Sequence, residues 1–416
     1  MHRALFAAAL ALLASPALAD AVTYTGTLGK TSIVVELTSD PATATTPFAG
    51  RYFYASKGID IPLDGVSAKG GKLTLNEEAP CTETTCALDD DGYVTKFPIG
   101  GKWTLAASAD GKTLSGTWQS KGKALPIALT QAGTRTLPDD TEMTPLGLGA
   151  IVADIAMGEA VITRQTSPYD FLRMDVPPTK SDPTTMEGST FQYLSDPRTK
   201  FQFPTILSLK DGSDPSAANA YLRSVHWSMN ADAFDCEARQ YAGFDWSASV
   251  GYAAGTYGGY TENEFTEVQG LTPKILSYLE SGSTDCGYAH PNNHAEYNNI
   301  DIAAGQPLDL SRIFTGWRKS DDENGAGPSK ELADFVRSHL KDPGLNLADP
   351  EECDYDTLVG TNLAVAFKPG NKVLLTLDGL EYAIQACGAD LWEGPITELK
   401  PYLAPTAADY FPVLKN

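Results

Sequence analysis

Between Val22 and Thr130 the chain alternates short apolar segments with turn-forming residues. In several segments apolar and polar residues follow one another with a period of two, which is typical of strands that bury one face. The segments are VTYTGTL (22–28), SIVVELT (32–38), GRYFYA (50–55), GIDIPL (58–63), GKLTLNE (71–77), GKWTLAA (101–107), KTLSGTWQ (112–119) and ALPIALT (124–130). Pairs such as Gly70-Gly71 and Asp110-Gly111 between them favour turns. We therefore predict an antiparallel β domain over 20–132.

Segments of this number and length are enough to close a small barrel or to fold into a sandwich, and both arrangements protect the sheet edges. The interior of a small barrel is either filled by side chains or holds one small ligand. We expect the filled interior, and a small-ligand carrier is the alternative.

The pattern changes between residues 133 and 166. Leu146, Leu148, Ile151, Ile155 and Val161 recur at the spacing of one helix face, although glycines lie near the start. We predict a linker that contains a short packed helix.

From residue 167 to the C-terminus, predicted strands and helices are mixed. Strands are expected over YDFLRMDV (169–176), STFQYLS (189–195), KFQFPTILSL (200–209), FDWSASVGYAAGTYGGY (244–260), EFTEVQG (264–270), NLAVAFKP (362–369), KVLLTL (372–377) and LEYAIQA (380–386). Asp214-Pro215 offers an N-cap and a first-turn proline for a helix over 217–229. Further helices are expected over 311–317 and 330–340. Runs of strands with inserted helices favour an α+β domain with an antiparallel sheet over 167–416.

The first nineteen residues are typical of a secretory signal peptide. Arg3 precedes an apolar run from Ala4 to Leu13, and Ala17-Leu18-Ala19 forms a cleavage motif before Asp20. The run is shorter than the ~20 residues needed to cross a bilayer, and no later segment approaches that length. We expect a signal peptide over 1–19 and a periplasmic or secreted protein without a membrane span.

All six cysteines follow the predicted signal peptide, and an even number in an exported chain favours disulfides. Cys81 and Cys86 flank a short loop, so a bridge between them shapes that loop more than it stabilises the fold. The other four allow three pairings. We prefer Cys236 with Cys286 and Cys353 with Cys387, each stabilising by ~3–4 kcal/mol through its long loop.

The chain is strongly acidic, with 53 acidic and 31 basic residues and a net charge of −22. Phosphate groups would repel such a surface, so nucleic acid and anionic lipid are excluded as partners. Cationic proteins, cationic sugars and divalent ions remain as partners. Solubility alone is the other explanation of the charge.

His290 and His294 lie four residues apart, the spacing that places two imidazoles on one helix face for zinc. Pro291 and the two following asparagines oppose a helix there, and Cys286 is expected to be oxidised. We therefore assign no metal ligand and no cofactor, and expect a turn in which His290 bonds the backbone.

The sequence contains neither a Gly-x-Ser-x-Gly elbow nor a phosphate-binding glycine loop. The carboxylate pair of a glycoside hydrolase cannot be read from a sequence, because the fold sets its separation. We assign no catalytic residue, and an envelope hydrolase that cleaves cell-wall polysaccharide is the alternative function.

Aromatic residues gather in one glycine-rich region. They are Trp227, Tyr241, Phe244, Trp246, Tyr252, Tyr257 and Tyr260. Aromatic side chains on a sheet stack on sugars or anchor a protein partner, although more often they fill a core. We assign Trp246 and Tyr257 to a binding surface.

The stretch from Gly287 to Phe314 contains Ala289-His290-Pro291, then a polar strand, then Asp301-x-x-x-Gly305-x-x-Leu308 before Ile313-Phe314. This order resembles the uncharacterised envelope domain shared by the lysozyme-binding anti-sigma factor RsiV and the non-catalytic part of the peptidoglycan deacetylase PdaC. The segments FPTILSLKDGSDPSAANAYL upstream and LEYAIQACGADLWEGPITELKPYL downstream also resemble that domain. The resemblance covers 201–403 and leaves the N-terminal β domain outside.

The resemblance implies a non-enzymatic binding protein of the cell envelope. Its partner would be a cationic protein such as lysozyme, or cell-wall glycan in the form of peptidoglycan. The binding residues expected from the central stretch are Tyr288, His290, Asn292 and His294. The chain departs from both relatives, because it has no transmembrane helix to relay a signal and no deacetylase domain.

Overall fold

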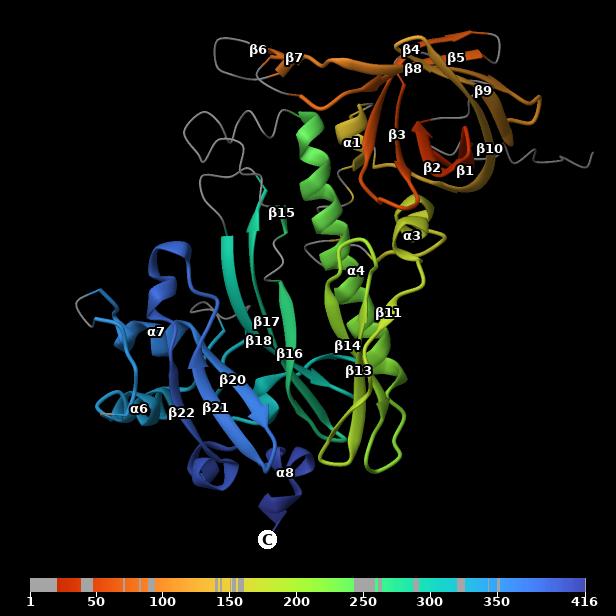
Figure 1. Ribbon diagram of the computed structural model, residues 1–416. Helices are drawn as coiled ribbons and strands as arrows, with labels where there is room; N and C mark the ends of the chain where they lie inside the picture. The colour runs from red at the N-terminus through yellow and green to blue at the C-terminus, as the bar shows by residue number, and fades with distance from the viewer. Residues whose placement is uncertain are drawn as a thin grey trace, which may run out of the picture.

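Figure 1 shows the computed structural model of the chain. The structure describes residues 21–38, 48–69, 72–81, 84–88, 94–138, 141, 142, 144–149, 151, 155, 161–242, 259, 260, 264–286, 292–319, 326–342, 344–349 and 352–415. The predicted signal peptide and four of the predicted binding residues lie outside the described residues; those four are Tyr288, His290, Trp246 and Tyr257.

The N-terminal strands close into an eight-stranded antiparallel barrel, which confirms the predicted β domain. The strands are β1 (Ala21–Leu28), β2 (Thr31–Thr38), β3 (Ala49–Tyr54), β4 (Ile61–Lys69), β5 (Lys72–Glu78), β8 (Ile99–Ala107), β9 (Thr113–Ser120) and β10 (Lys123–Arg135). The barrel closes because β1 pairs with both β2 and β10. A separate two-stranded sheet, β6 (Ala87–Leu88) with β7 (Val94–Lys96), is inserted between β5 and β8 of the barrel.

The barrel interior is filled by side chains, as expected. The buried aliphatic residues of the strands surround Tyr24, Tyr52 and Trp103. Glu77 lies among them and is satisfied by three donors, since Tyr52 Oη (2.9 Å), Trp103 Nε1 (2.9 Å) and Trp118 Nε1 (2.8 Å) all donate to its Oε2. This packing gives no support to the small-ligand carrier.

The segment after the barrel differs from the prediction. A helix α1 (Pro145–Gly149) is present, with Leu148 buried, but Val161 is 67% exposed and does not share its packed face. The strand expected over 169–176 is wrong, because this segment forms helix α3 (Pro168–Met174). Proline suits the first turn of a helix, and the helical spacing buries Tyr169, Asp170 and Arg173 together between the barrel and the rest of the chain.

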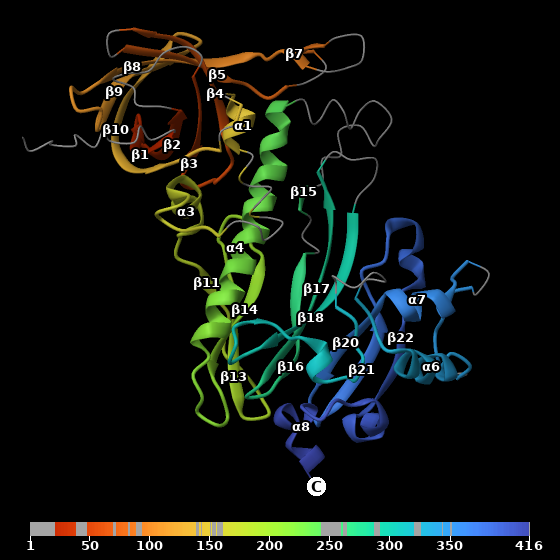
Figure 2. The same ribbon diagram turned by 180° about the vertical axis from the view of Figure 1, so that it is seen from behind.

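A small sheet and a long helix follow. The sheet contains β11 (Thr179–Lys180), β12 (Thr184–Met186), β13 (Ser189–Ser195) and β14 (Gln202–Ser208). Helix α4 (Ser216–Ala238) begins one residue later than the Asp214-Pro215 signal predicted, because Pro215 is its N-cap and not its first residue. Asp214 Oδ1 accepts from the Ser216 amide at 3.0 Å. The helix continues beyond the predicted end at Met229, and it runs from the barrel along the following sheets in both views (Figures 1 and 2).

The central sheet has the order β15-β17-β18-β19, with β16 also paired to β17. Its strands are β15 (Gly259–Tyr260), β16 (Phe265–Leu271), β17 (Ile275–Asp285), β18 (Asn292–Asp301) and β19 (Gln306–Pro307). One face packs on α4 and β14 through Val268, Leu276 and Tyr278. The other face meets β20 (Leu363–Lys368), where Ser277 Oγ accepts from the Phe367 amide at 3.1 Å.

The C-terminal sheet pairs β20 with β21 (Lys372–Leu377) and β21 with β22 (Asp390–Pro395). The predicted strand over 380–386 is wrong, because both edges of β21 are already paired and the segment forms a short 3-10 helix, η3 (Tyr382–Cys387). The helix expected over 311–317 is reduced to one turn, η2 (Leu310–Arg312).

Helices cover this sheet. They are α6 (Lys330–His339), α7 (Tyr355–Thr361), η4 (Ile396–Tyr402), α8 (Ala407–Tyr410) and η5 (Pro412–Lys415), and η1 (Arg239–Ala242) extends α4. Ser329 caps α6 by accepting from the Leu332 amide at 3.2 Å, as expected for the helix predicted over 330–340. Together with the sheets, these helices confirm the predicted α+β class.

The cysteines form three disulfides, Cys81–Cys86, Cys236–Cys286 and Cys353–Cys387, so the preferred pairing is confirmed. Disulfides of this kind are consistent with a protein of an extracellular or periplasmic compartment. Across the described helices, none combines the length and the apolar character that a bilayer crossing requires.

Candidate functional site

Of the binding residues predicted from the sequence, His294 is the one whose side-chain contacts the structure describes. Strand β18 begins at Asn292, so His294 is its third residue. The segment is extended and not helical, as Pro291 and the two asparagines led us to expect. Strand pairing then decides which residues join His294.

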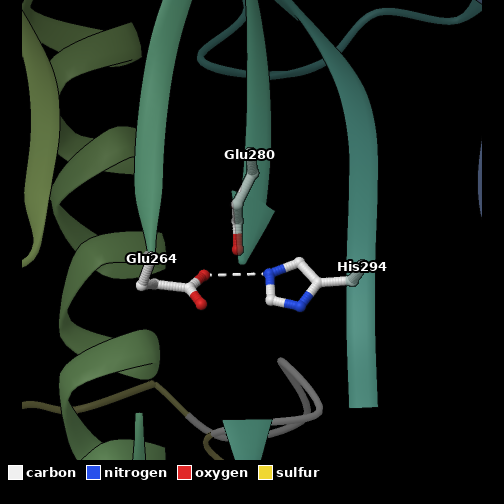
Figure 3. Close-up of side chains that lie close together, drawn as sticks. All are labelled: Glu264, Glu280 and His294. Carbon is white, nitrogen blue, oxygen red and sulfur yellow. Dashed lines mark hydrogen bonds and ion pairs between the residues drawn. The ribbon is translucent and has the colours of Figure 1, made fainter. Parts of the chain in front are cut away.

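The strand register places Glu264, Gly282 and His294 side by side on three neighbouring segments. Gly282 of β17 pairs with His294 of β18, and Ser281 pairs with Phe265 at the start of β16. Glu264, directly before β16, therefore lies beside Gly282 on the same side of the sheet as His294. Alternation places Glu280, two residues before Gly282, on this side as well. Figure 3 shows the three side chains of Glu264, Glu280 and His294 converging from three neighbouring segments of the sheet.

We call Glu264, Glu280 and His294 the His294 site. His294 Nε2 donates to Glu264 Oε1 at 2.9 Å. One carboxylate oxygen from each glutamate and one ring nitrogen of His294 all lie within 4.8 Å of one another. The Glu264 side chain is 1% exposed and the His294 side chain 19%, so the site is buried on one side and reachable from the other.

Glycine at position 282 makes room for the Glu264 carboxylate. A Cβ atom on residue 282 would lie 1.9 Å from Glu264 Oε2, far inside contact distance. The absence of a side chain thus lets the carboxylate lie flat against β17. The tripeptide SGS at 281–283 leaves room for the Glu264 carboxylate, but its sequence alone does not predict a site there.

Two buried oxygens near His294 have no hydrogen-bond partner among the described residues. They are Glu264 Oε2 and Thr266 Oγ1. Thr266 is buried and pairs directly with Glu280, so it lies in the next row on the same face. A buried oxygen without a partner costs free energy, so the described part of this region leaves room for a donor or a cation.

Further carboxylates surround the site. Glu296 pairs directly with Glu280 across β17 and β18, and Asp232 lies on α4. Burial and the charges of Glu264 and Glu296 raise the pKa of Glu280 to about 7. Burial and the charges of Asp235 and Glu264 raise the pKa of Asp232 to about 6, against the opposing effect of Arg239. We call Asp232, Glu264, Glu280 and Glu296 the carboxylate cluster.

Two basic side chains act on this cluster among the described residues: His294 is hydrogen-bonded to Glu264, and Arg239 acts on Asp232 through its charge. The hydrogen bond to Glu264 raises the pKa of the His294 ring, with the charges of Glu264, Glu280 and Glu296 adding to the effect while burial opposes it. Among the described residues, no lysine or arginine forms an ion pair with Glu264, Glu280 or Glu296. The arrangement therefore has the chemistry of a cation site.

The sequence prediction missed Glu264 and Glu280. Both are distant from His294 along the chain, and only the pairing of β16, β17 and β18 brings them together. The available signal was an acidic residue at position 280, on the buried face of a strand in which Leu276 and Tyr278 are buried. An acidic residue at such a position requires a partner.

A search against protein-family models finds none that matches the chain, and a search of curated proteins finds no match either. The resemblance to the RsiV and PdaC domain therefore stays a prediction.

Proposed function

We propose that this chain is an exported, non-enzymatic binding protein of the cell envelope that recognises a cationic protein of the lysozyme class. The observation that supports it most is the carboxylate cluster. Glu280 and Glu296 are paired side by side on neighbouring strands, and among the described residues neither forms an ion pair with a lysine or an arginine. Glu296 is exposed, so its charge is available to a partner.

The net charge of −22 also favours a cationic partner. A strongly acidic surface attracts a cationic protein over a distance set by the salt concentration, with a Debye length of roughly 30 Å at 0.01 M and roughly 8 Å at 0.15 M. The resemblance to a domain that binds lysozyme points to the same kind of partner, and the disulfides suit a protein that meets it outside the cytoplasm.

Binding to hen-type lysozyme tests the proposal. We expect a complex at low ionic strength whose affinity falls steeply as salt is added, because salt screens the attraction between exposed charges on the two proteins. The variant Glu280→Gln with Glu296→Gln should weaken binding several-fold. Its matched control is Glu381→Gln with Glu398→Gln, which makes the same chemical change at two exposed residues on other elements.

Three results would overturn the proposal. Absence of binding at low ionic strength would exclude this class of partner. Equal weakening by both double variants would show that the carboxylate cluster is not the contact surface. Retention of the chain on insoluble peptidoglycan, without affinity for lysozyme, would replace the partner with cell-wall glycan.

A further inference from the structure

We propose that the His294 site binds a divalent transition-metal ion of the zinc class, with Glu264, Glu280 and His294 as ligands. The inference names a small cation for the same carboxylates and shares Glu280 with the proposed function. The two are tested separately, because metal binding requires the ring of His294 and lysozyme recognition does not.

The ligand set defines the class of metal. Zinc is bound by imidazole nitrogen and carboxylate oxygen at about 2.0–2.2 Å, usually with tetrahedral geometry. Three protein ligands with a fourth position open to water are typical of zinc sites that are not fully closed. Calcium and magnesium take oxygen ligands almost alone, so the imidazole disfavours both.

The distances require only a small adjustment. Ligand atoms around a tetrahedral zinc ion are separated by about 3.3 Å, given bond lengths near 2 Å. His294 Nε2 and Glu264 Oε1 are already 2.9 Å apart, held by the proton between them. All three ligand atoms lie within 4.8 Å of one another. Glu280 is half-buried, as His294 is, and its long side chain can rotate toward the other two. A metal ion would replace that shared proton.

Burial provides an independent observation. The Glu264 carboxylate is 1% exposed, and its Oε2 has no partner among the described residues. A buried carboxylate with one free oxygen, beside a second carboxylate, lacks positive charge. A divalent ion supplies that charge to both glutamates at once, whereas a protonated His294 reaches only Glu264 by hydrogen bond.

Thr266 Oγ1 adds to this picture. It is a second buried oxygen without a partner, and its residue pairs with Glu280 in the row beside His294.

Isothermal titration of the full, metal-stripped chain with zinc chloride tests the inference. We expect one zinc ion per chain, because the three ligand atoms converge on one place. His294→Gln should weaken zinc binding by more than about tenfold, since one of three ligands is lost. The matched control is His339→Gln, a histidine on α6, which should leave zinc binding unchanged.

A second variant separates ligation from folding. Glu280→Gln keeps the size of the side chain and removes one ligand carboxylate, so the metal-free variant should melt no lower than the wild type and still bind zinc more weakly. A residue with a merely structural role would not show both effects.

Three outcomes would overturn the inference. The wild-type chain does not bind zinc; His294→Gln and His339→Gln weaken binding equally; or calcium binds more tightly than zinc, which would exclude the transition-metal class.

Discussion

Asp170→Asn is expected to lower the free energy of unfolding by about 3–5 kcal/mol. The Asp170 carboxylate lies between two buried guanidinium groups, with Oδ2 3.1 Å from Arg51 Nη2 and Oδ1 2.5 Å from Arg173 Nη2. All three side chains are 2% exposed or less. Arg51 keeps its ion pairs with Glu36 and Asp60, and Arg173 keeps the one with Asp60. The neutral amide still removes one buried negative charge from between the two cations, so the native state loses more than one hydrogen bond.

Urea unfolding at neutral pH measures this effect. The control is Asp175→Asn, which breaks an ion pair with Arg164 whose side chains are 51% and 56% exposed, and should cost less than about 1 kcal/mol. Equal losses in the two variants would contradict the prediction.

The pH dependence of Asp170 follows from its surroundings. Burial disfavours the charged form, but the charges of Arg51, Arg173 and Arg135 outweigh it and hold the pKa of Asp170 below its ordinary value. An acid whose folded pKa is depressed stabilises the fold above its unfolded pKa, and this contribution disappears as the pH falls through the folded pKa. The difference between Asp170→Asn and the wild type should therefore shrink in acid.

Removal of the Cys236–Cys286 disulfide is expected to lower the free energy of unfolding by about 4 kcal/mol. The bridge joins the last turn of α4 to the residue after β17 and closes a loop with a sequence separation of 50. In the chain-entropy description, the bridge reduces the freedom of the unfolded chain more when its loop is longer.

The double variant Cys236→Ser with Cys286→Ser measures this effect by urea unfolding. Its matched control is Cys81→Ser with Cys86→Ser, whose sequence separation is 5 and whose loss should be about 2 kcal/mol. A larger loss from the short bridge than from the long one would contradict the expectation.

The barrel could be predicted from the sequence because apolar and polar residues alternate within each strand, so the pattern of each strand can be recognised by itself. Segments such as SIVVELT and GKWTLAA alternate over one buried face, and the turns between them are marked by glycine. Helix α3 was not predicted, because the short segment YDFLRMDV fits both the two-residue period of a strand and the 3.6-residue period of a helix. Its conformation depends on Pro168 and on burying Asp170 and Arg173 against Arg51, a contact between distant parts of the chain.

The candidate site could be predicted only in part. His294 was singled out from its local motif, whereas its partners come from β17 and from the residue before β16. A shift of one residue in either pairing would turn Glu264 or Glu280 to the other face of the sheet. Sequence patterns do not report that register, so the identity of the cation site required the structure.

The titration of the His294 ring in the metal-free chain, followed by NMR, tests most directly whether Glu264 and His294 form the hydrogen-bonded pair on which the His294 site depends. We expect a pKa above the ordinary 6.5, which falls in Glu264→Gln and is unchanged in Glu398→Gln. Since the folded pKa is raised, the pair stabilises the fold below pH 6.5 and loses this effect as the pH rises through the folded pKa. A ring pKa at or below 6.5, or one that Glu264→Gln leaves unchanged, would contradict the account.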